Sequence, residues 1–289
     1  MSVRVFAPAK INLTLQVGAP RADGFHPVQS VVVFADVGDW VEAAAGQRLS
    51  LREIVGPFAK DLTAREDNLV ECAAHALCRA TGSDLGAVLT LEKNLPVASG
   101  VGGGSSDAAA TLKALKGLWS LNLEDDQLMR IAAGIGADVP ACMRAQSAWM
   151  TGIGEVVVPL WVPTLHAVLV NPLRSLPTRA VFREFDRMHL GGAFAASAPP
   201  IWRTPAEAIA GAAAHGNDLA TPARALMPEI ATMERALCAD ARTLHAGLSG
   251  SGATMFALVE NADIASSLAS DVSSARPDWW VRATVLGPA

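Results

Sequence analysis

The sequence predicts an α+β fold with one or two mixed or antiparallel sheets. Two observations lead to this prediction. Runs rich in β-branched residues, which are typical of strands, lie at 3–7, 11–17, 28–34 and 87–91. Segments with apolar residues at helical spacing lie between and after these runs. Strands and helices alternate without a regular period, which argues against a doubly wound parallel sheet.

The helices are predicted from their caps as well as from their spacing. In "EDNLVECAAHALCRATG" (66–82), Asp67 or Asn68 stands where a helix cap belongs and Gly82 stands at the end. Two further helices are predicted, at 106–118 and at 125–133. The second opens with two aspartates, whose negative charges suit a helix N-terminus.

The pattern restarts beyond Pro159, which places a domain boundary near residue 155. We therefore expect an N-terminal domain at 1–155 and a C-terminal domain at 156–289. The elements predicted for the second domain are strands at 166–172, 252–260 and 279–286, helices at 177–188 and 263–275, and a loop at 191–200.

Composition narrows the class of protein. The chain has 289 residues, 51% of them hydrophobic, and a net charge of -5, which argues against nucleic acid as the main partner. No apolar run approaches the ~20 residues of a membrane span, and the N-terminus lacks the pattern of a secretory signal. The four cysteines are scattered and are expected in the core of a reduced, cytoplasmic protein. The sequence leaves the oligomeric state open.

The stretch "NLPVASGVGGGSSDAAATL" (94–112) favours a phosphate-binding loop. Glycines let the backbone turn several N–H groups inward, and the following helix adds its positive end. Ser105, Ser106 and Asp107 stand where that helix is expected to begin, and serine hydroxyls can donate to phosphate oxygens. The glycines of the bend are Gly100, Gly102, Gly103 and Gly104.

Two alternatives compete with this interpretation. A dinucleotide fingerprint fits poorly, because Ser105 stands at the final glycine position and the usual βαβ context is missing. A purely structural glycine-rich turn is the other alternative. The Walker pattern is absent, since no GK[ST] follows the glycines.

Two further stretches are candidates for the site. Asp138, in "GIGADVPACM" (134–143), lies between a flexible turn and Pro140 on a restrained backbone, although a turn aspartate that satisfies local N–H groups is the alternative. The segment "GLSGSGATMFAL" (247–258) is a second Gly/Ser loop that leads into a strand, for which an ordinary hairpin loop is the alternative. Two such loops suit a single anionic ligand.

Together these stretches resemble the GHMP kinase superfamily, whose members phosphorylate small metabolites with ATP. Its three motifs are matched in order by "PAKINLTLQV" (8–17), "LPVASGVGGGSSDAA" (95–109) and "GLSGSGATMF" (247–256). "RADGFHPVQSVV" (21–32), "REDNLV" (65–70) and "GADVP" (136–140) resemble the branch that acts on a cytidyl-linked methylerythritol in the non-mevalonate isoprenoid pathway.

The resemblance implies a two-domain α+β fold with the active site in the interdomain cleft. It also implies transfer of the ATP γ-phosphoryl group to the 2-hydroxyl of the cytidyl substrate, with Mg²⁺ held mostly by phosphates and water rather than by protein ligands. The catalytic pair of the family falls on Lys10 and Asp138. A lysine can stabilise the site's anions and an aspartate can accept or orient the hydroxyl proton. For Lys10 the alternative is a solvated lysine.

The resemblance also implies the binding residues. For ATP these are Pro96, Gly100, Gly102, Gly103, Gly104, Ser105, Ser106, Lys93 and Asn68; for the cytidyl substrate they are Asn12, Phe25, His26 and Phe182. Phe25 replaces the usual tyrosine of the family, so a ring remains to stack on the pyrimidine but its hydroxyl is lost. A core aromatic is the alternative for Phe25.

Three other functions remain as alternatives. A catalytically silent GHMP-fold sensor would keep the nucleotide loop without turnover, and the presence of both Lys10 and Asp138 argues against it. A related kinase would act on mevalonate, phosphomevalonate or homoserine, and "DGFH" with "GADVP" argues against that. A Rossmann oxidoreductase is the third alternative.

Overall fold

The computed structural model describes residues 1–62, 68–192 and 197–287, which form two compact units. The first unit contains residues 1–9, 38–97 and 102–145, and the second contains 10–37, 98–101 and the chain from 146 onward. Each unit is thus assembled from separate stretches of chain. The consecutive division into 1–155 and 156–289 stays a prediction. Strands β1 (Ser2–Asn12) and β3 (Val28–Ala45) contribute residues to both units.

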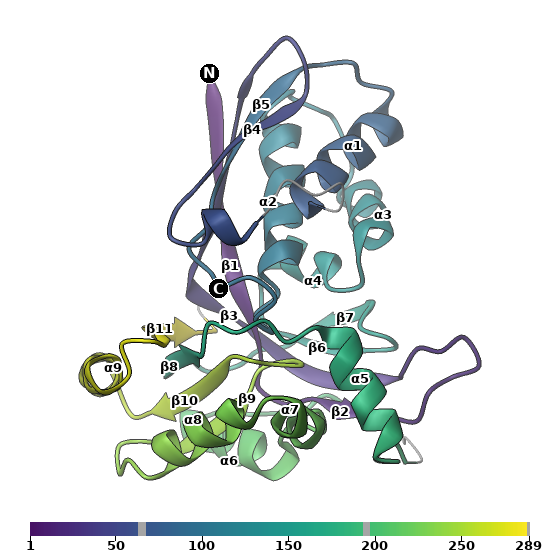
Figure 1. The fold of residues 1–289 in the computed structure, drawn as a ribbon. Coiled ribbons are helices and arrows are strands. Elements are labelled where there is room, and N and C mark those ends of the chain that lie inside the picture. Colours follow the sequence, from purple (N-terminus) through teal and green to yellow (C-terminus); the bar gives the residue numbers. More distant parts are fainter. Residues whose placement is uncertain (63–67, 193–196, 288–289) are drawn as a thin grey trace. The chain divides into compact units, whose positions relative to one another are not determined.

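In the first unit, helices pack against a sheet (Figure 1). Strand β5 is antiparallel to β3 and parallel to β4. Besides the parts of β1 and β3, the elements are β4 (Ser50–Val55), η1 (Ala59–Asp61), α1 (Leu69–Thr81), β5 (Ala87–Glu92), α2 (Gly103–Leu118), α3 (Asp125–Ile135) and α4 (Val139–Arg144). Helix α1 packs most extensively on α2, and α2 also packs on α4.

Local signals explain where these helices begin. Asn68 caps α1, since its side chain accepts a hydrogen bond from the N–H of Val70 at 2.9 Å. Helix α2 begins at Gly103, three residues before the predicted start at 106. The reason is that Gly102 takes the N-cap position with φ +63°, a conformation that glycine adopts without strain. Ser105 and Ser106 therefore lie inside the first turn rather than at the point where the helix begins, which corrects the predicted start.

In the second unit, β8 lies between β10 and β11 and is antiparallel to both; β9 pairs with β10. Residues 28–37 of β3 pair with β2, β6 and β11. The elements are β2 (Gln16–Val17), β6 (Ala148–Thr151), β7 (Val156–Pro159), β8 (Leu165–Asn171), α5 (Thr178–Arg187), α6 (Pro205–His215), α7 (Ala220–Leu226), α8 (Pro228–Cys238), β9 (His245–Leu248), β10 (Met255–Val259), α9 (Ala262–Ala275) and β11 (Trp280–Leu286).

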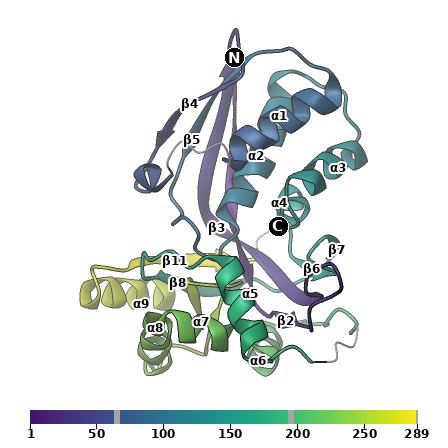
Figure 2. The same cartoon turned by 45° about the vertical axis from the view of Figure 1, so that its right-hand side comes forward.

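The core of the second unit lies between this sheet and its helices, and Figure 2 shows α7, α8 and α9 alongside the strands. Val168 and Val170 of β8 are fully buried, as is Phe185 of α5. Strand β8 is apolar along nearly its whole length because neighbouring strands enclose both its edges and its side chains are buried.

Most predicted elements are present, but the strand predicted at 28–34 continues to residue 45 in β3, and the strand predicted at 11–17 is divided between the end of β1 and the short β2. Helices α4, α6, α7 and α8 and several short strands were not predicted. The predicted loop at 191–200 lies partly outside the described residues. The expectation that the cysteines are core residues is confirmed for Cys142, which is buried, and is wrong for Cys238, which is exposed at the end of α8. No helix in the described part of the chain is long and apolar enough to cross a membrane.

Candidate active site

Lys10 is a buried lysine near the end of β1. Only 4% of its surface is exposed, so the alternative of a solvated lysine is wrong. Its Nζ donates to Oδ1 of Asn12 at 3.3 Å, and its backbone N–H donates to the carbonyl oxygen of Val101 at 2.8 Å. The strand that carries the predicted catalytic lysine is thus bonded directly to the glycine-rich segment.

The amide of Asn12 is oriented by a neighbouring hydroxyl. Ser30 Oγ donates to the carbonyl oxygen of Thr14 at 2.5 Å, so it accepts from Asn12 Nδ2 at 2.7 Å. This arrangement leaves Asn12 Oδ1 as the atom that faces Lys10. Asn12 is itself buried, and its hydrogen bonds fix both its own position and one contact of the lysine.

The two Gly/Ser loops lie in contact, as the prediction of a shared anionic ligand requires. Ser249 Oγ donates to the carbonyl oxygen of Gly100 at 2.9 Å, and Thr254 N–H donates to that of Ser99 at 2.9 Å. A Cβ on Gly100 would come within 2.5 Å of the Ser249 carbonyl oxygen, and Gly100 has φ +78°. Glycine is therefore required here by the approach of the second loop.

The start of α2 suits a phosphate. Its N-cap, Gly102, has no side chain to cover the first N–H groups, and these groups carry the positive end of the helix dipole. Ser105 lies in the first turn and is partly exposed. Ser106 is buried and its Oγ donates to the carbonyl oxygen of Pro8 at 2.7 Å. That bond gives Ser106 a packing role within the first unit; its contact with ATP stays a prediction.

Lys93 is held by two buried carboxylates. Its Nζ donates to Asp107 Oδ2 at 2.7 Å and also to Asp39 Oδ2. Asp39 additionally accepts from the N–H groups of Asn94 and Leu95. The predicted ATP contact of Lys93 therefore remains a prediction, whereas its structural role in joining β3, α2 and the end of β5 is plain.

Burial and the neighbouring charges shift the pKa values of Lys93 and Asp107 in opposite directions. Burial raises the pKa of the Asp107 carboxyl to about 7, although the nearby Lys93 ammonium acts in the opposite direction. Burial alone would lower the pKa of Lys93, but the attraction of Asp107 and Asp39 raises it above its ordinary value. Asp107 Oδ1 is buried without a hydrogen-bond partner among the described residues. Burial is thus the larger effect on the pKa of Asp107, and the charge of Lys93 offsets only part of it.

Asp138 stands at the N-cap position of α4, followed by Pro140 in the first turn. Its side chain makes no cap hydrogen bond to the described first-turn N–H groups, and the residue is partly buried. Asp138 therefore does not cap its own helix, and the choice between a catalytic aspartate and a turn aspartate that satisfies local N–H groups stays a prediction. Two residues predicted to lie near the nucleotide are also in the first unit. Asn68 caps α1, and Pro96 is buried.

His26 packs against two aromatic rings of helix α5. Its ring lies 4.9 Å from that of Phe182 and 5.9 Å from that of Phe185, measured between centroids. His26 Nε2 lies 2.8 Å from Asp186 Oδ1, so a neutral ring that donates there keeps Nδ1 as an acceptor. Phe25 is 57% exposed, so the alternative of a core aromatic is wrong.

Sequence reasoning missed Asp186, Ser249 and Asp39. A signal existed for Asp186, since it stands four residues after Phe182 and hence on the same face of α5. Ser249 belongs to a loop that the sequence did single out. For Asp39, we find no signal in the sequence that distinguishes it from a surface aspartate.

The candidate residues divide between the units. The second unit contains Lys10, Asn12, Phe25, His26, Phe182 and Gly100; the first contains Asp138, Asn68, Lys93, Pro96, Gly102, Gly103, Gly104, Ser105 and Ser106.

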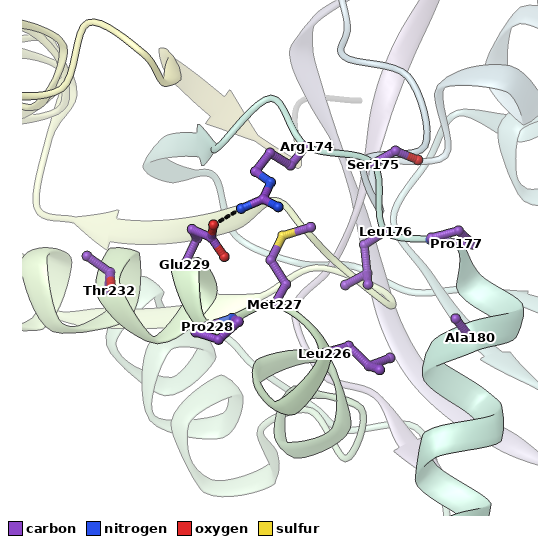
Figure 3. A pocket seen from close by; sticks show the side chains of 10 residues that line it. All are labelled: Arg174, Ser175, Leu176, Pro177, Ala180, Leu226, Met227, Pro228, Glu229 and Thr232. Atoms are coloured by element: carbon purple, nitrogen blue, oxygen red, sulfur yellow. Dashed lines mark ion pairs between the residues drawn. The ribbon is translucent and has the colours of Figure 1, made fainter.

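A pocket of the second unit, of about 730 Å³, lies between the start of α5 and α8 (Figure 3). Its rim carries the ion pair between Arg174 and Glu229. Its described lining residues include none of the predicted site residues.

Metal ions in proteins are bound by clusters of side chains that approach one another closely. Within residues 1–62, 68–192 and 197–287, no three His, Cys, Asp or Glu side chains gather where they could hold a metal ion.

Comparison with known proteins identifies the class. Residues 68–146 match the family described as GHMP kinases N terminal domain, and residues 202–278 match GHMP kinases C terminal. The chain belongs to the GHMP kinase family. Its fold agrees with this, since it resembles a crystal structure of a homoserine kinase with a TM-score of 0.65 at 18% identity, over 98% of this chain and 94% of that one.

Within the family, two relatives above 40% identity over nearly the full chain carry the same name. A 4-diphosphocytidyl-2-C-methyl-D-erythritol kinase of Parvibaculum lavamentivorans is 47% identical over 97% of both chains. The kinase of the same name from Caulobacter vibrioides is 44% identical over 98% of both. A crystal structure of 4-(cytidine 5'-diphospho)-2C-methyl-D-erythritol kinase has a TM-score of 0.78 and 32% identity, and covers 99% of this chain and 100% of that one.

Proposed function

We propose that the chain transfers the γ-phosphoryl group of ATP to the 2-hydroxyl of 4-diphosphocytidyl-2-C-methyl-D-erythritol, in the non-mevalonate isoprenoid pathway. Its place among the GHMP kinases makes it a small-molecule kinase that uses ATP. The observation that supports the substrate is the 47% identity to a relative of that name over 97% of both chains. We also propose a cytoplasmic location.

The reaction forms a bond between the substrate oxygen and the γ-phosphorus and breaks the bond from that phosphorus to the bridging oxygen of ADP. Little covalent chemistry is left for the protein, so positioning and charge stabilisation dominate. In our proposal the buried Lys10 ammonium offsets phosphoryl charge, and Asp138 orients the hydroxyl and takes its proton. Burial supports the role of Lys10, because a desolvated charge acts more strongly on a nearby anion.

ATP and the acceptor are assigned to different groups. The N–H groups at the start of α2 and the glycine segment that contacts Ser249 are proposed to hold the phosphates, with Pro96, Asn68 and Lys93 near the nucleotide. Mg²⁺ would supply further neutralisation of phosphate charge when bound. Asn12, Phe25, His26 and Phe182 are proposed to hold the cytidyl substrate, with the exposed ring of Phe25 stacked on the pyrimidine.

The test is a direct assay. Purified protein incubated with ATP, Mg²⁺ and the cytidyl substrate should release ADP and yield a monophosphorylated product, measured by coupled absorbance and mass spectrometry. ADP release with mevalonate, phosphomevalonate or homoserine instead would reject the proposed substrate. Calorimetric binding of ATP without any ADP release would favour a silent sensor.

A further inference from the structure

Asn217 makes two hydrogen bonds to the second Gly/Ser loop and accepts a third from its own turn. Its Nδ2 donates to the carbonyl oxygens of Leu248 and Gly250, each at 2.8 Å. Its Oδ1 accepts from the N–H of Leu219 at 2.8 Å, which fixes the orientation of the amide. Asn217 thus holds the backbone of 248–250 through both of its amide hydrogens, at a distance of about thirty residues along the chain.

The turn that carries Asn217 is also hydrogen-bonded to Leu15, which follows strand β1. Leu15 N–H donates to the carbonyl oxygen of Gly216 at 2.9 Å, and Asp218 N–H donates to that of Leu15 at 2.9 Å. Leu15 and Asn217 form a parallel bridge. The turn therefore connects the loop to the segment that follows Lys10 and Asn12.

The loop that Asn217 holds reaches the candidate site through Ser249. Ser249 is fully buried; its Oγ accepts from the backbone N–H of Asn12 at 3.2 Å and donates to the carbonyl oxygen of Gly100 at 2.9 Å. A single hydroxyl thus joins the strand of the lysine to the glycine-rich segment. All these contacts lie within the second unit.

We infer that Asn217 and Ser249 are positioning residues of the kinase. Asn217 holds the backbone of loop 248–250, and the hydroxyl of Ser249, in that loop, holds the strand end that carries Lys10 and Asn12 next to residues 99–101. This inference rests on the proposed function, because that function gives Lys10 and the glycine segment their roles. Neither residue needs to touch a substrate. Removal of Asn217 would leave two backbone carbonyls without their donors and let the loop shift.

The test compares the steady-state kinetics of wild type, Asn217→Ala, Ser249→Ala and the double variant. We expect each single substitution to lower kcat about 10-fold or more, since misplacement by about 1 Å costs up to about 100-fold. KM for the cytidyl substrate should change less than about three-fold. Because both residues act through one loop, the loss in the double variant should be smaller than the product of the two single losses.

Asn261→Ala is the matched control. Asn261 lies in the same unit, and its Oδ1 accepts from the N–H of Ile264 at 3.0 Å as the cap of α9. Its loss should lower Tm, because it removes a helix cap, and leave kcat and KM at the wild-type values. If Asn217→Ala does not fold, Asn217→Asp keeps the shape of the side chain but removes its donors.

The outcomes are distinguishable. A wild type that releases no ADP with the cytidyl substrate would reject the proposed function. Wild-type kcat in Asn217→Ala and Ser249→Ala, beside an active wild type, would overturn the inference alone. Hydrogen exchange of the backbone amides tests the inference without any substrate. The amides of Asn12 and Thr254 should exchange faster in Asn217→Ala than in Asn261→Ala. Equal exchange rates in the two variants would also overturn the inference.

Discussion

At the scale of single residues, the polar groups of the candidate site are fixed in position by hydrogen bonds and ring contacts. The orientation of Asn12 follows from the hydroxyl of Ser30, and the contact of Lys10 with Asn12 follows in turn. His26 is placed by two aromatic rings and by the carboxylate of Asp186. Such constraints place a reactive group at low entropic cost when substrate binds.

Substitution of Asp138 tests its proposed role in the chemical step. We expect Asp138→Asn to lower kcat about 100-fold or more and to change KM for either substrate by only a few fold, because a group that accepts or orients the transferred proton acts mainly in the transition state. Steady-state assays measure both constants. Unchanged kcat would contradict the role.

Asp186 provides a second test at this scale. Asp186→Ala removes the acceptor for His26 Nε2, and loss of about 1 kcal/mol of hydrogen bonding corresponds to a rise of about five-fold in KM for the cytidyl substrate. KM for ATP should not change. Arg183→Ala, on an exposed position of the same helix, is the control. Equal constants in both variants would show that Asp186 does not orient the histidine.

At the scale of elements, the start of α2 is held by the ion cluster beneath it. Asp107, in the second turn of the helix, shares the Lys93 ammonium with Asp39 of β3, and a Cβ on Gly103 would lie 3.1 Å from Lys93 Nζ. The first turn of the helix therefore packs directly on the cluster. Buried ion pairs of this kind fix geometry more surely than they add stability.

The raised pKa of Asp107 predicts the pH dependence of this element. The folded protein binds the Asp107 proton more tightly than the unfolded chain between the ordinary value of 3.8 and about 7. The contribution of this group to stability is therefore full below 3.8 and is lost as pH rises through about 7, by up to about 1.4 kcal/mol per pH unit. Asp107→Asn, which cannot titrate, should remove this slope.

Urea unfolding between pH 4.5 and 8 measures the effect. The free energy of unfolding of Asp107→Asn, relative to wild type, should rise with pH over this range. Parallel curves for the two proteins would show that Asp107 keeps the same proton affinity in both states. Asp240→Asn is a comparison at a surface aspartate, where the Arg242 hydrogen bond lowers the pKa to about 2 and no slope is expected above pH 4.5.

At the scale of the whole molecule, each compact unit is assembled from separate stretches of chain. Strand β11 pairs with β3 through Leu286 and Ala35, and β10 begins beside residues that bond to Ser99 and Gly100. The C-terminal half of the sequence therefore lacks part of the unit to which it belongs.

This assembly predicts the behaviour of fragments. The isolated segment 156–289 should not unfold cooperatively, because it lacks residues 10–37 and 98–101, which contribute backbone partners to its unit. Thermal unfolding followed by circular dichroism measures this. A sharp transition in the isolated segment would instead support 156–289 as an independent domain.

Much of the fold was predictable because its signals are local. Asn68 and Gly82 bound α1 as expected, and the β-branched runs of β1, β3 and β8 form strands. Helix α6 was not predicted, since its alanine-rich sequence carries a weak apolar pattern. Helix α8 was missed although Ile230, Met233 and Leu237 stand at helical spacing. The start of α2 was misplaced because Gly102, a poor helix residue, is a good cap in the left-handed conformation.

The sequence by itself determined the family, the order of the three motifs and the types of residue that phosphoryl transfer needs. The tertiary structure alone decided that the Gly/Ser loops at 99–101 and 249–252 meet, that Lys10 is buried, and that Asn217 holds the second loop. The physical reason is separation: Ser249 and Gly100 lie 149 residues apart, so no local pattern encodes their contact. Only the pairing of strands and the packing of the core bring such groups within hydrogen-bond distance.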